Sequence, residues 1–164
     1  MSKLCMIAAI GNNLEIGYKN QLLCHLPKDL KRFKAITTGY TVLMGDRTWE
    51  SLPVKPLPNR RNIVITLNKE ADYEGCELAF SVEEALKMIE KEEKAFIIGG
   101  ATIYRLMLQY ADELYITRIL ANFEADAFFP EIKSEEWQLT DEVLDVKDEK
   151  NQYDIIYQHY IRIK

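Results

Sequence analysis

Short apolar runs alternate with amphipathic segments along most of the chain. The first run, LCMIAAI at residues 4–10, is short and almost entirely hydrophobic, which predicts a strand buried on both faces. Similar runs predict further strands in TVLM (41–44), NIVIT (62–66), CELAF (76–80), AFII (95–98) and ELYITRI (113–119). Turn residues bound these runs, so we expect each to form a separate strand.

Helices are predicted between these strands. A helix is expected from Pro27 to Thr37, and the glycine turn in GDRTWES opens a short one. SVEEALKMIEK begins with a capping box formed by Ser81 and Glu84, and ATIYRLMLQY follows a Gly-Gly turn. The segments WQLTDEVLDV and YDIIYQHYIRI predict a terminal antiparallel hairpin.

This alternation of strands and helices predicts an α/β fold. We expect a mostly parallel central sheet with an antiparallel C-terminal edge strand and helices on both faces. The length of 164 residues and the absence of repeats or linker-like tracts predict a single domain over residues 1–164. One long polar loop, GNNLEIGYKNQLLCH, interrupts the pattern, and loops of this length in compact domains are often binding loops or lids.

Composition narrows the possible functions. The net charge of −5 argues against nucleic acid as a partner and requires any anionic ligand to meet locally clustered Arg or Lys. The three cysteines are odd in number and widely spaced, which argues against a disulfide framework. Since the sequence also shows no signal peptide and no membrane-spanning run, we expect a cytoplasmic protein. The only histidines, His25 and His159, lack neighbours at metal-ligand spacing, so no metal site is expected and His159 is interpreted as structural.

Two strand–glycine–helix junctions, at Gly45 and at Gly99-Gly100, are candidates for phosphate binding. Such junctions place free backbone N–H groups and a helix start at the carboxyl edge of a sheet. Neither matches a dinucleotide fingerprint or a Walker loop, and each glycine alone can simply serve the turn. Together they predict a dinucleotide that spans two helix starts.

Asp29 and Arg60 are candidates for ligand binding. In the first helical turn, Asp29 can act as a partner of the helix dipole or of Arg32. It also shares a helix face with Phe33, four residues on, where its carboxylate could bind a planar amidine-like edge through two parallel hydrogen bonds. Arg60 follows the stiff PLPN loop and is either a solvated surface residue or a bidentate carboxylate binder.

In order and spacing, these segments resemble the dihydrofolate reductase family over essentially the whole chain. The resemblance lies in MIAAI, IGYKNQLLCHLPKDLKRFK, VLMGDRTWESL, PLPNRRNIVIT, FIIGGATIY, LYITRI and EADAFFP. It implies reduction of 7,8-dihydrofolate to 5,6,7,8-tetrahydrofolate, which supplies one-carbon metabolism. A hydride passes from the nicotinamide of NADPH to pterin C6, and N5 receives a proton.

The resemblance also implies roles for individual residues. Asp29 corresponds to the acid that grips the pterin, Thr117 to its hydrogen-bonding partner, and Arg60 to the residue that holds the glutamate α-carboxylate. The implied catalytic residues are Asp29, Thr117 and Leu22, and the implied substrate-binding residues are Ile7, Asp29, Leu30, Phe33, Leu52, Leu57, Arg60, Ile98 and Thr117.

For the cofactor, the resemblance implies contacts along the closing loop and at both glycine junctions, the second of which has a cis peptide in this family. These residues are Ala9, Ile16, Gly17, Asn20, Gln21, Gly45, Arg47, Thr48, Thr66, Gly99, Gly100, Ala101, Thr102, Ile103 and Tyr104. Residues 17–23 correspond to the closing loop, and Asp126 to a residue that helps to hold its closed state.

Several positions depart from the family pattern. Cys24 replaces a tryptophan whose indole N–H fixes a water near the pterin, and Leu23 replaces a proline. Near the 2′-phosphate of the cofactor, Asp46 stands where a basic residue is usual and Leu67 where a serine is common. Arg47 and Arg61 are the residues expected to compensate, so we predict a weakened but not reversed preference for NADPH.

Two alternatives differ in class from a working dihydrofolate reductase. One is a reductase of the same fold that acts on another heterocycle, and the other is a pterin- or nucleotide-binding protein with weakened catalysis. The expected partners are folate and antifolates such as trimethoprim and methotrexate. We expect no nucleic-acid or membrane partner, and a monomer.

Overall fold

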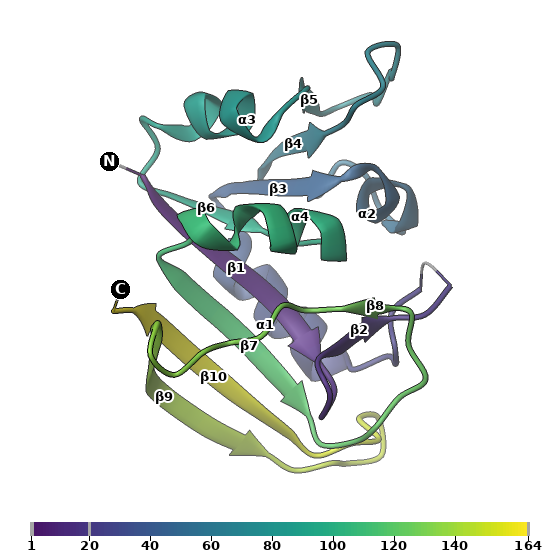
Figure 1. The fold of residues 1–164 in the computed structure, drawn as a ribbon. Coiled ribbons are helices and arrows are strands. Elements are labelled where there is room, and N and C mark those ends of the chain that lie inside the picture. The colour runs from purple at the N-terminus through teal and green to yellow at the C-terminus, as the bar shows by residue number, and fades with distance from the viewer. Residues whose placement is uncertain (1, 20, 164) are drawn as a thin grey trace.

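The computed structural model describes residues 2–19 and 21–163, which contain ten strands. They are β1 (Lys3–Ile10), β2 (Glu15–Gly17), β3 (Thr41–Gly45), β4 (Arg61–Ile65), β5 (Glu77–Ala79), β6 (Lys94–Ile97), β7 (Glu113–Ile119), β8 (Ala127–Phe128), β9 (Trp137–Asp145) and β10 (Ile155–Arg162). Eight of them form one sheet in the order β5-β4-β3-β6-β1-β7-β10-β9 (Figure 1).

The predicted fold class is confirmed. The pairs from β5 through to β7 are all parallel, whereas β10 pairs antiparallel with both β7 and β9. The terminal hairpin therefore closes one side of the sheet, with β9 at the edge and β10 inserted next to β7. Because the remaining strands run in one direction, their carboxyl ends meet along a single edge.

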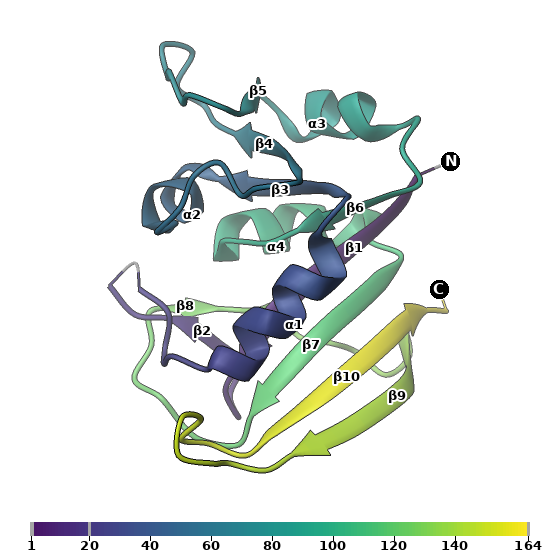
Figure 2. The same ribbon diagram turned by 180° about the vertical axis from the view of Figure 1, so that it is seen from behind.

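Helices cover both faces of the sheet (Figures 1 and 2). They are α1 (Pro27–Thr37), α2 (Asp46–Ser51), α3 (Val82–Ile89) and α4 (Ala101–Met107), the last continued by the 3-10 helix η1 (Leu108–Tyr110). Buried residues of α3 and α4 join one core cluster, and side chains of α1 and α2 pack on the other. The Ser81 half of the predicted capping box is present at the start of α3, since Ser81 Oγ accepts from the Glu84 N–H at 3.0 Å.

The two clusters explain why β1 is apolar along its length. Met6 points into the cluster below α3 and α4, whereas Cys5 and Ile7 point into the cluster below α1 and α2. When a strand is covered on both faces, burial of every apolar side chain stabilises the fold, by about 1.5–3 kcal/mol for each large one. The short apolar runs of the sequence are thus the signature of this three-layer arrangement.

The loop predicted over residues 11–25 contains a strand that the sequence pattern does not indicate. β2 pairs with β8 in a small two-stranded sheet, and the Asp126 N–H donates to Gly17 O at 3.0 Å. The Asp126 carboxylate in turn accepts from the Lys19 N–H at 3.1 Å. A three-residue strand is too short to show a period, and its partner lies far along the chain.

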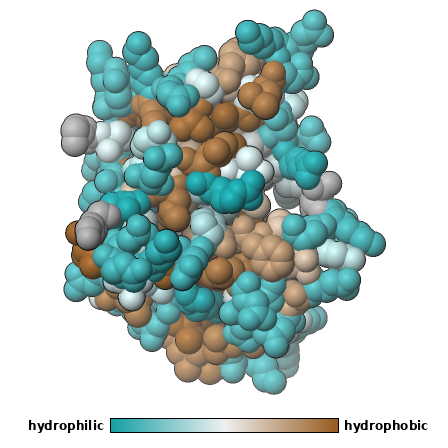
Figure 3. Space-filling model, viewed as in Figure 1, coloured by the Kyte–Doolittle hydropathy of each residue, from teal (hydrophilic) through white to brown (hydrophobic). Residues whose placement is uncertain are grey.

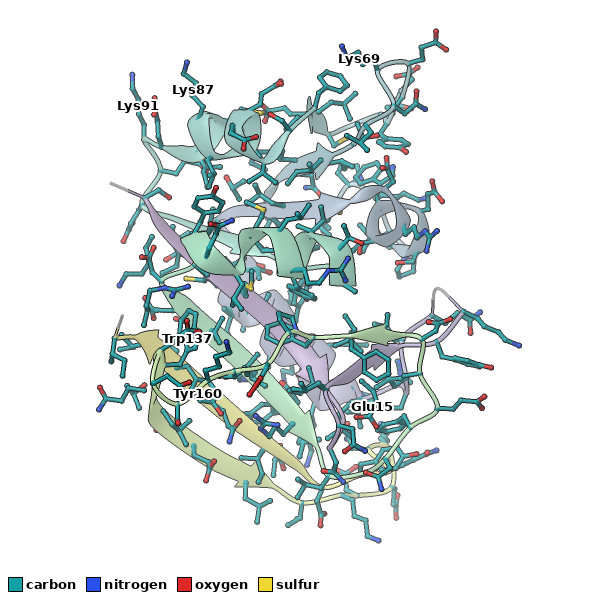
Figure 4. The ribbon with its side chains drawn as sticks, in the orientation of Figure 1. Glu15, Lys69, Lys87, Lys91, Trp137 and Tyr160 are labelled. Atoms are coloured by element: carbon teal, nitrogen blue, oxygen red, sulfur yellow. The ribbon has the colours of Figure 1, made fainter. Side chains whose placement is uncertain are left out.

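Glu15 anchors this loop from below, and Figure 4 labels its side chain at the base of β2. The residue is only 2% exposed, and its carboxylate accepts hydrogen bonds from the N–H groups of Phe123 (2.7 Å) and Asn13. Burial alone raises the pKa of Glu15, yet these backbone N–H groups hold it below the ordinary value. Gly11 leaves room for the carboxylate, because a Cβ there would lie 2.8 Å from Glu15 Oε1.

His159 has the structural role expected of it. Its Nε2 lies 2.6 Å from Glu113 Oε1, and its ring stacks on Tyr115 with centroids 4.6 Å apart. Glu113 also pairs with Lys3 at 2.8 Å, so this histidine ties β10 to β7 and β1 at the end of the sheet away from Asp29.

Figure 3 shows hydrophobic side chains on one face among mostly hydrophilic ones. Exposed apolar residues of the chain include Leu106 on α4 and Phe128 on β8. Within the described part of the chain, every helix is too short or too polar to span a membrane.

Candidate active site

Helix α1 crosses one face of the sheet next to β7 (Figure 2), and Asp29 on α1 meets Thr117 on β7. Thr117 Oγ1 on β7 donates a hydrogen bond to Asp29 Oδ1 at 2.6 Å. Pro27 starts α1, as is favourable at a first helical position, and this places Asp29 in the first turn above β7. The predicted pairing of these two residues is therefore present in the structure.

The environment of Asp29 changes the acidity of its carboxyl group. Burial raises its pKa above the ordinary value, and the Thr117 hydrogen bond and the charge of Arg32 oppose that rise. Among ion pairs between described residues, none includes Asp29, because the Arg32 guanidinium lies over the Tyr157 ring at 4.3 Å. The local reading of Asp29 as an Arg32 ion-pair partner is therefore wrong, whereas its position still suits the helix dipole.

An apolar wall lies beside this carboxylate. Phe33 on α1, and Leu52 and Leu57 on the loop between α2 and β4, pack against the core cluster that contains Ile7. Ile98 packs against the same cluster. In contrast, Leu30 and Leu22 are exposed, Leu22 by 75%. The structure thus brings together most of the predicted substrate-binding side chains and leaves Leu22 on the surface of its loop.

Arg60 is directed towards α1, which is the orientation that a carboxylate binder on the stiff PLPN loop requires and a solvated surface residue does not. Its Nη1 donates to Thr37 Oγ1 at 3.0 Å, and its guanidinium lies 5.9 Å from the Phe33 ring centroid. Thr37 was not identified from the sequence. A signal was nevertheless available, because residues 29, 33 and 37 are spaced four apart and share one face of the helix.

The two glycine junctions lie side by side. β3 and β6 are parallel neighbours, and the Gly45 N–H donates to Gly99 O at 3.0 Å. The Gly99-Gly100 peptide is cis, as the family resemblance implies, and Gly99 has a φ of +132°. A Cβ on Gly99 would lie 3.2 Å from Thr48 Oγ1, so glycine keeps this cradle open. The two helix starts therefore offer adjoining backbone N–H groups that fit a dinucleotide phosphate.

Tyr104 joins the two halves of this region from within the core. It is buried, and its hydroxyl donates to the backbone oxygen of Ile7 at 2.7 Å. Burial, aided by the charge of Asp29, raises the pKa of Tyr104 well above its ordinary value. The side chain of this predicted cofactor residue thus supports β1 beneath the Gly99 turn.

The other predicted cofactor residues gather along the carboxyl edge of the sheet. They are Ala9, Ile16, Gly17 and Gln21 at and beyond β1, Arg47 and Thr48 in α2, Thr66 after β4, and Ala101, Thr102 and Ile103 in α4. Asn20, which was predicted with them, lies outside the described residues.

The acid at the start of α2 has a partner that the sequence pattern does not reveal. The Tyr73 hydroxyl donates to Asp46 Oδ1 at 2.7 Å, and this bond with the carboxylate raises the pKa of Tyr73 to about 12. Tyr73 lies in the loop before β5, where neither spacing nor periodicity indicates a contact with α2. Nearby, Leu67 is 91% exposed.

The expectation that Arg61 offsets the charge of Asp46 is wrong. Arg61 begins β4 and faces Thr41 at the start of β3, whereas Asp46 follows the end of that strand. Its guanidinium is bound to Glu77 at 2.8 Å and to Glu92 at 3.2 Å. Parallel strand direction thus places Arg61 at the opposite edge of the sheet.

Cys24 lies close to the acid, as its place before α1 suggests. The residue is partly buried and packs against the small core cluster of Leu26, Ile119 and Ile155. Burial, and secondly the charge of Asp29, raise the pKa of Cys24 above the ordinary thiol value. A neutral thiol therefore occupies the position where the family pattern has an indole.

Comparison with known proteins agrees with this geometry. A family model described as dihydrofolate reductase matches residues 3–162. A dihydrofolate reductase of Bacillus subtilis is 41% identical over 157 residues, covering 96% of this chain and 93% of that protein. One from Neisseria meningitidis is 49% identical over 140 residues, covering 84% and 85%. A solved structure of the Enterococcus faecalis dihydrofolate reductase with NADP(H) and RAB-propyl has a TM-score of 0.93 at 39% identity, covering 99% of this chain and 97% of that one.

Replacing Thr117 by valine tests the electrostatics of the pair. The Thr117 hydrogen bond lowers the pKa of Asp29, so its loss should raise that pKa further. NMR titration of the Asp29 carboxyl carbon measures the shift, with Thr140→Val on β9 as the matched control. The free energy of unfolding should also fall by about 1–3 kcal/mol. An Asp29 pKa that stays the same or falls in Thr117→Val contradicts this assignment.

Proposed function

The chain belongs to the dihydrofolate reductase family, and we propose that it binds its substrate through the Asp29–Thr117 pair. It is an NADPH-dependent oxidoreductase that reduces 7,8-dihydrofolate to 5,6,7,8-tetrahydrofolate. A reductase of another heterocycle, or a pterin- or nucleotide-binding protein with weakened catalysis, is not favoured by these relatives. The observation that carries the proposal is the 2.6 Å hydrogen bond that fixes one oxygen of a partly buried carboxylate beside an apolar wall.

Asp29 is suited to recognise the pterin edge. Thr117 occupies one lone pair of Oδ1, which leaves acceptor sites on both carboxylate oxygens. A 2-amino group and the neighbouring N3 can donate to these two oxygens in parallel. The bond from Thr117 sets the plane of the carboxylate before substrate arrives, so less orientational freedom is lost on binding.

Asp29 also assists protonation of N5. A free aspartic acid has a pKa near about 3.9 and cannot itself donate a proton efficiently at neutral pH. Burial moves the pKa of Asp29 upward, towards the working range. We assign the immediate proton donation to water or to the substrate, with Asp29 biasing the protonation of the pterin.

The remainder of the substrate follows α1 towards its carboxyl end. Leu30, Phe33, Leu52 and Leu57 offer apolar surface to the pterin and aminobenzoyl rings, and Ile7 and Ile98 close the pterin end. Arg60, held by Thr37, offers two parallel N–H groups to the glutamate α-carboxylate. Leu22 is assigned to the closing loop, which excludes water during the reaction.

The cofactor fits the paired glycine junctions. When bound, NADPH supplies the hydride that reduces pterin C6. Gly45, Arg47 and Thr48 at one helix start and Gly99–Tyr104 at the other would hold the phosphates. Ala9, Ile16, Gly17, Asn20 and Gln21 would border the nicotinamide half, and Thr66 the adenosine half. The adjacency of Gly45 and Gly99 supports this assignment.

The family binds folate, NADPH and antifolate inhibitors, and trimethoprim and methotrexate are the antifolates we propose here. We further propose that residues 1–164 act as one domain, as a monomer in the cytoplasm, without a nucleic-acid or membrane partner. The net charge of −5 supports the absence of nucleic acid.

Removing the acid tests the proposed function directly. Asp29→Asn should lower kcat with dihydrofolate by at least about 100-fold, because a neutral amide can neither pair with the pterin edge nor assist N5 protonation. The loss should grow as pH rises and protons become scarce. Loss of NADPH absorbance measures the rate, and Asp141→Asn on the exposed edge strand is the control. Near-normal turnover by Asp29→Asn contradicts the role of this residue.

Cofactor choice tests the consequence of Asp46. Its negative charge should disfavour a 2′-phosphate, so the preference for NADPH over NADH should be weak but not reversed. Asp46→Asn should raise kcat/KM with NADPH by about two- to fivefold and leave the value with NADH almost unchanged. Steady-state rates with both cofactors decide the matter. A wild-type preference for NADH contradicts the prediction.

A further inference from the structure

The helix that carries Asp29 does not cap its own N-terminus. Leu26 stands at the N-cap position and offers no side-chain hydrogen bond. Pro27 follows at the first helical position and has no N–H. Lys28 therefore supplies the first backbone donor of α1, directly before Asp29, and no described residue of the neighbouring sequence accepts from it.

The missing acceptor comes from the loop between β9 and β10, at residues 146–154. Asn151 Oδ1 accepts from the Lys28 N–H at 3.1 Å, across 123 residues of sequence. Asn151 is only 4% exposed. Figure 2 shows this loop below the first turn of α1. An asparagine oxygen on an early helical N–H is the arrangement of a good N-cap, although here it comes from a different segment.

Asp148 fixes the orientation of this asparagine. Its Oδ1 accepts from the Asn151 backbone N–H at 2.8 Å and from Asn151 Nδ2 at 2.9 Å. The Asp148 N–H donates back to Asn151 O at 2.9 Å. Because Nδ2 is bound to Asp148, the amide oxygen is the atom left to face Lys28.

The same loop holds Lys28 at its other end. The Lys28 ammonium lies 2.9 Å from Asp145 and 3.0 Å from Asp148. Partly exposed ion pairs of this kind contribute little to stability, so the hydrogen bond that the buried Asn151 accepts from the Lys28 N–H is the more important restraint. Lys28 is thus bound through both its backbone and its side chain, one residue before the acid.

We propose that Asn151 is a positioning residue for the reaction and that it holds the first turn of α1, and with it Asp29, against Thr117. This rests on the role of Asp29 in the proposed function. An uncapped first turn frays, and Asp29 lies within that turn. Fraying would loosen the carboxylate from the 2.6 Å bond to Thr117 while leaving α2 and α4 in place.

Replacing Asn151 by alanine should therefore weaken the binding of dihydrofolate and leave the binding of NADPH almost unchanged. We expect KM for dihydrofolate to rise by about fivefold or more, while KM for NADPH changes by less than about twofold. Hydrogen exchange of the Lys28 amide should also accelerate by about fivefold or more, since its acceptor is gone. A loss of stability alone reduces the active fraction and does not produce this split between the two KM values.

Two further variants identify the cause. Lys28→Ala removes both ion pairs but retains the backbone N–H, so both KM values should stay near those of the wild type. Asn151→Asp alone would set a second carboxylate against Asp148, so it is combined with Asp148→Asn. This exchanged pair retains an acceptor for the Lys28 N–H and should recover most of the affinity for dihydrofolate. If Asn151→Ala does not fold, Asn151→Ser serves instead, because its shorter side chain cannot reach from the loop to the Lys28 N–H.

An unchanged KM for dihydrofolate in Asn151→Ala, or an equal rise in both KM values, overturns the proposal. The proposal is also overturned if Lys28→Ala raises KM for dihydrofolate as strongly as Asn151→Ala does. Asp29→Asn is measured in parallel. If that variant retains activity, the proposed function itself fails; if it is inactive and Asn151→Ala is normal, only the role of Asn151 fails.

Discussion

The hydrogen bond between Thr117 and Asp29 is the contact on which the arrangement of the site depends. It joins the central part of the sheet to the helix that borders the substrate, at 2.6 Å between Oγ1 and Oδ1. A carboxylate that is partly withdrawn from water is costly unless it is hydrogen-bonded, so the bond both stabilises Asp29 in this position and fixes its orientation. It also opposes the rise in pKa that burial causes, which keeps the carboxylate available as an acceptor.

Different elements of the fold supply the substrate-binding residues and the cofactor-binding residues. α1 and the loops after α2 supply the acid, the apolar wall and the guanidinium of Arg60, all on one face of the sheet. The starts of α2 and α4 supply backbone N–H groups at the carboxyl edge, where Gly45 and Gly99 touch. Tyr104 ties these parts together by holding the backbone of Ile7. Substrate and cofactor can thus meet at one place although they bind to different elements.

Much of this could be read from the sequence because its signals are local. Apolar runs gave the buried strands, and Pro27 and Ser81 marked two helix starts. Contacts between distant segments left no such signal. β2 and β8 are too short to show a period, Tyr73 reaches Asp46 from a loop, and Asn151 reaches Lys28 across the fold. Arg61 precedes the predicted strand at 62–66, so the parallel direction of the sheet, rather than its nearness to Arg60 in sequence, decides which edge it occupies.

Binding of a modified pterin tests the central claim most directly. Dihydrofolate is compared with an analogue that carries a methyl group in place of the 2-amino group, for the wild type and for Asp29→Asn, in the presence of NADP+. If Asp29 binds the 2-amino edge, the wild type should bind the analogue at least about tenfold more weakly than dihydrofolate. Asp29→Asn should bind the two ligands with nearly the same, already reduced, affinity. The same ratio of affinities in both proteins would contradict the claim.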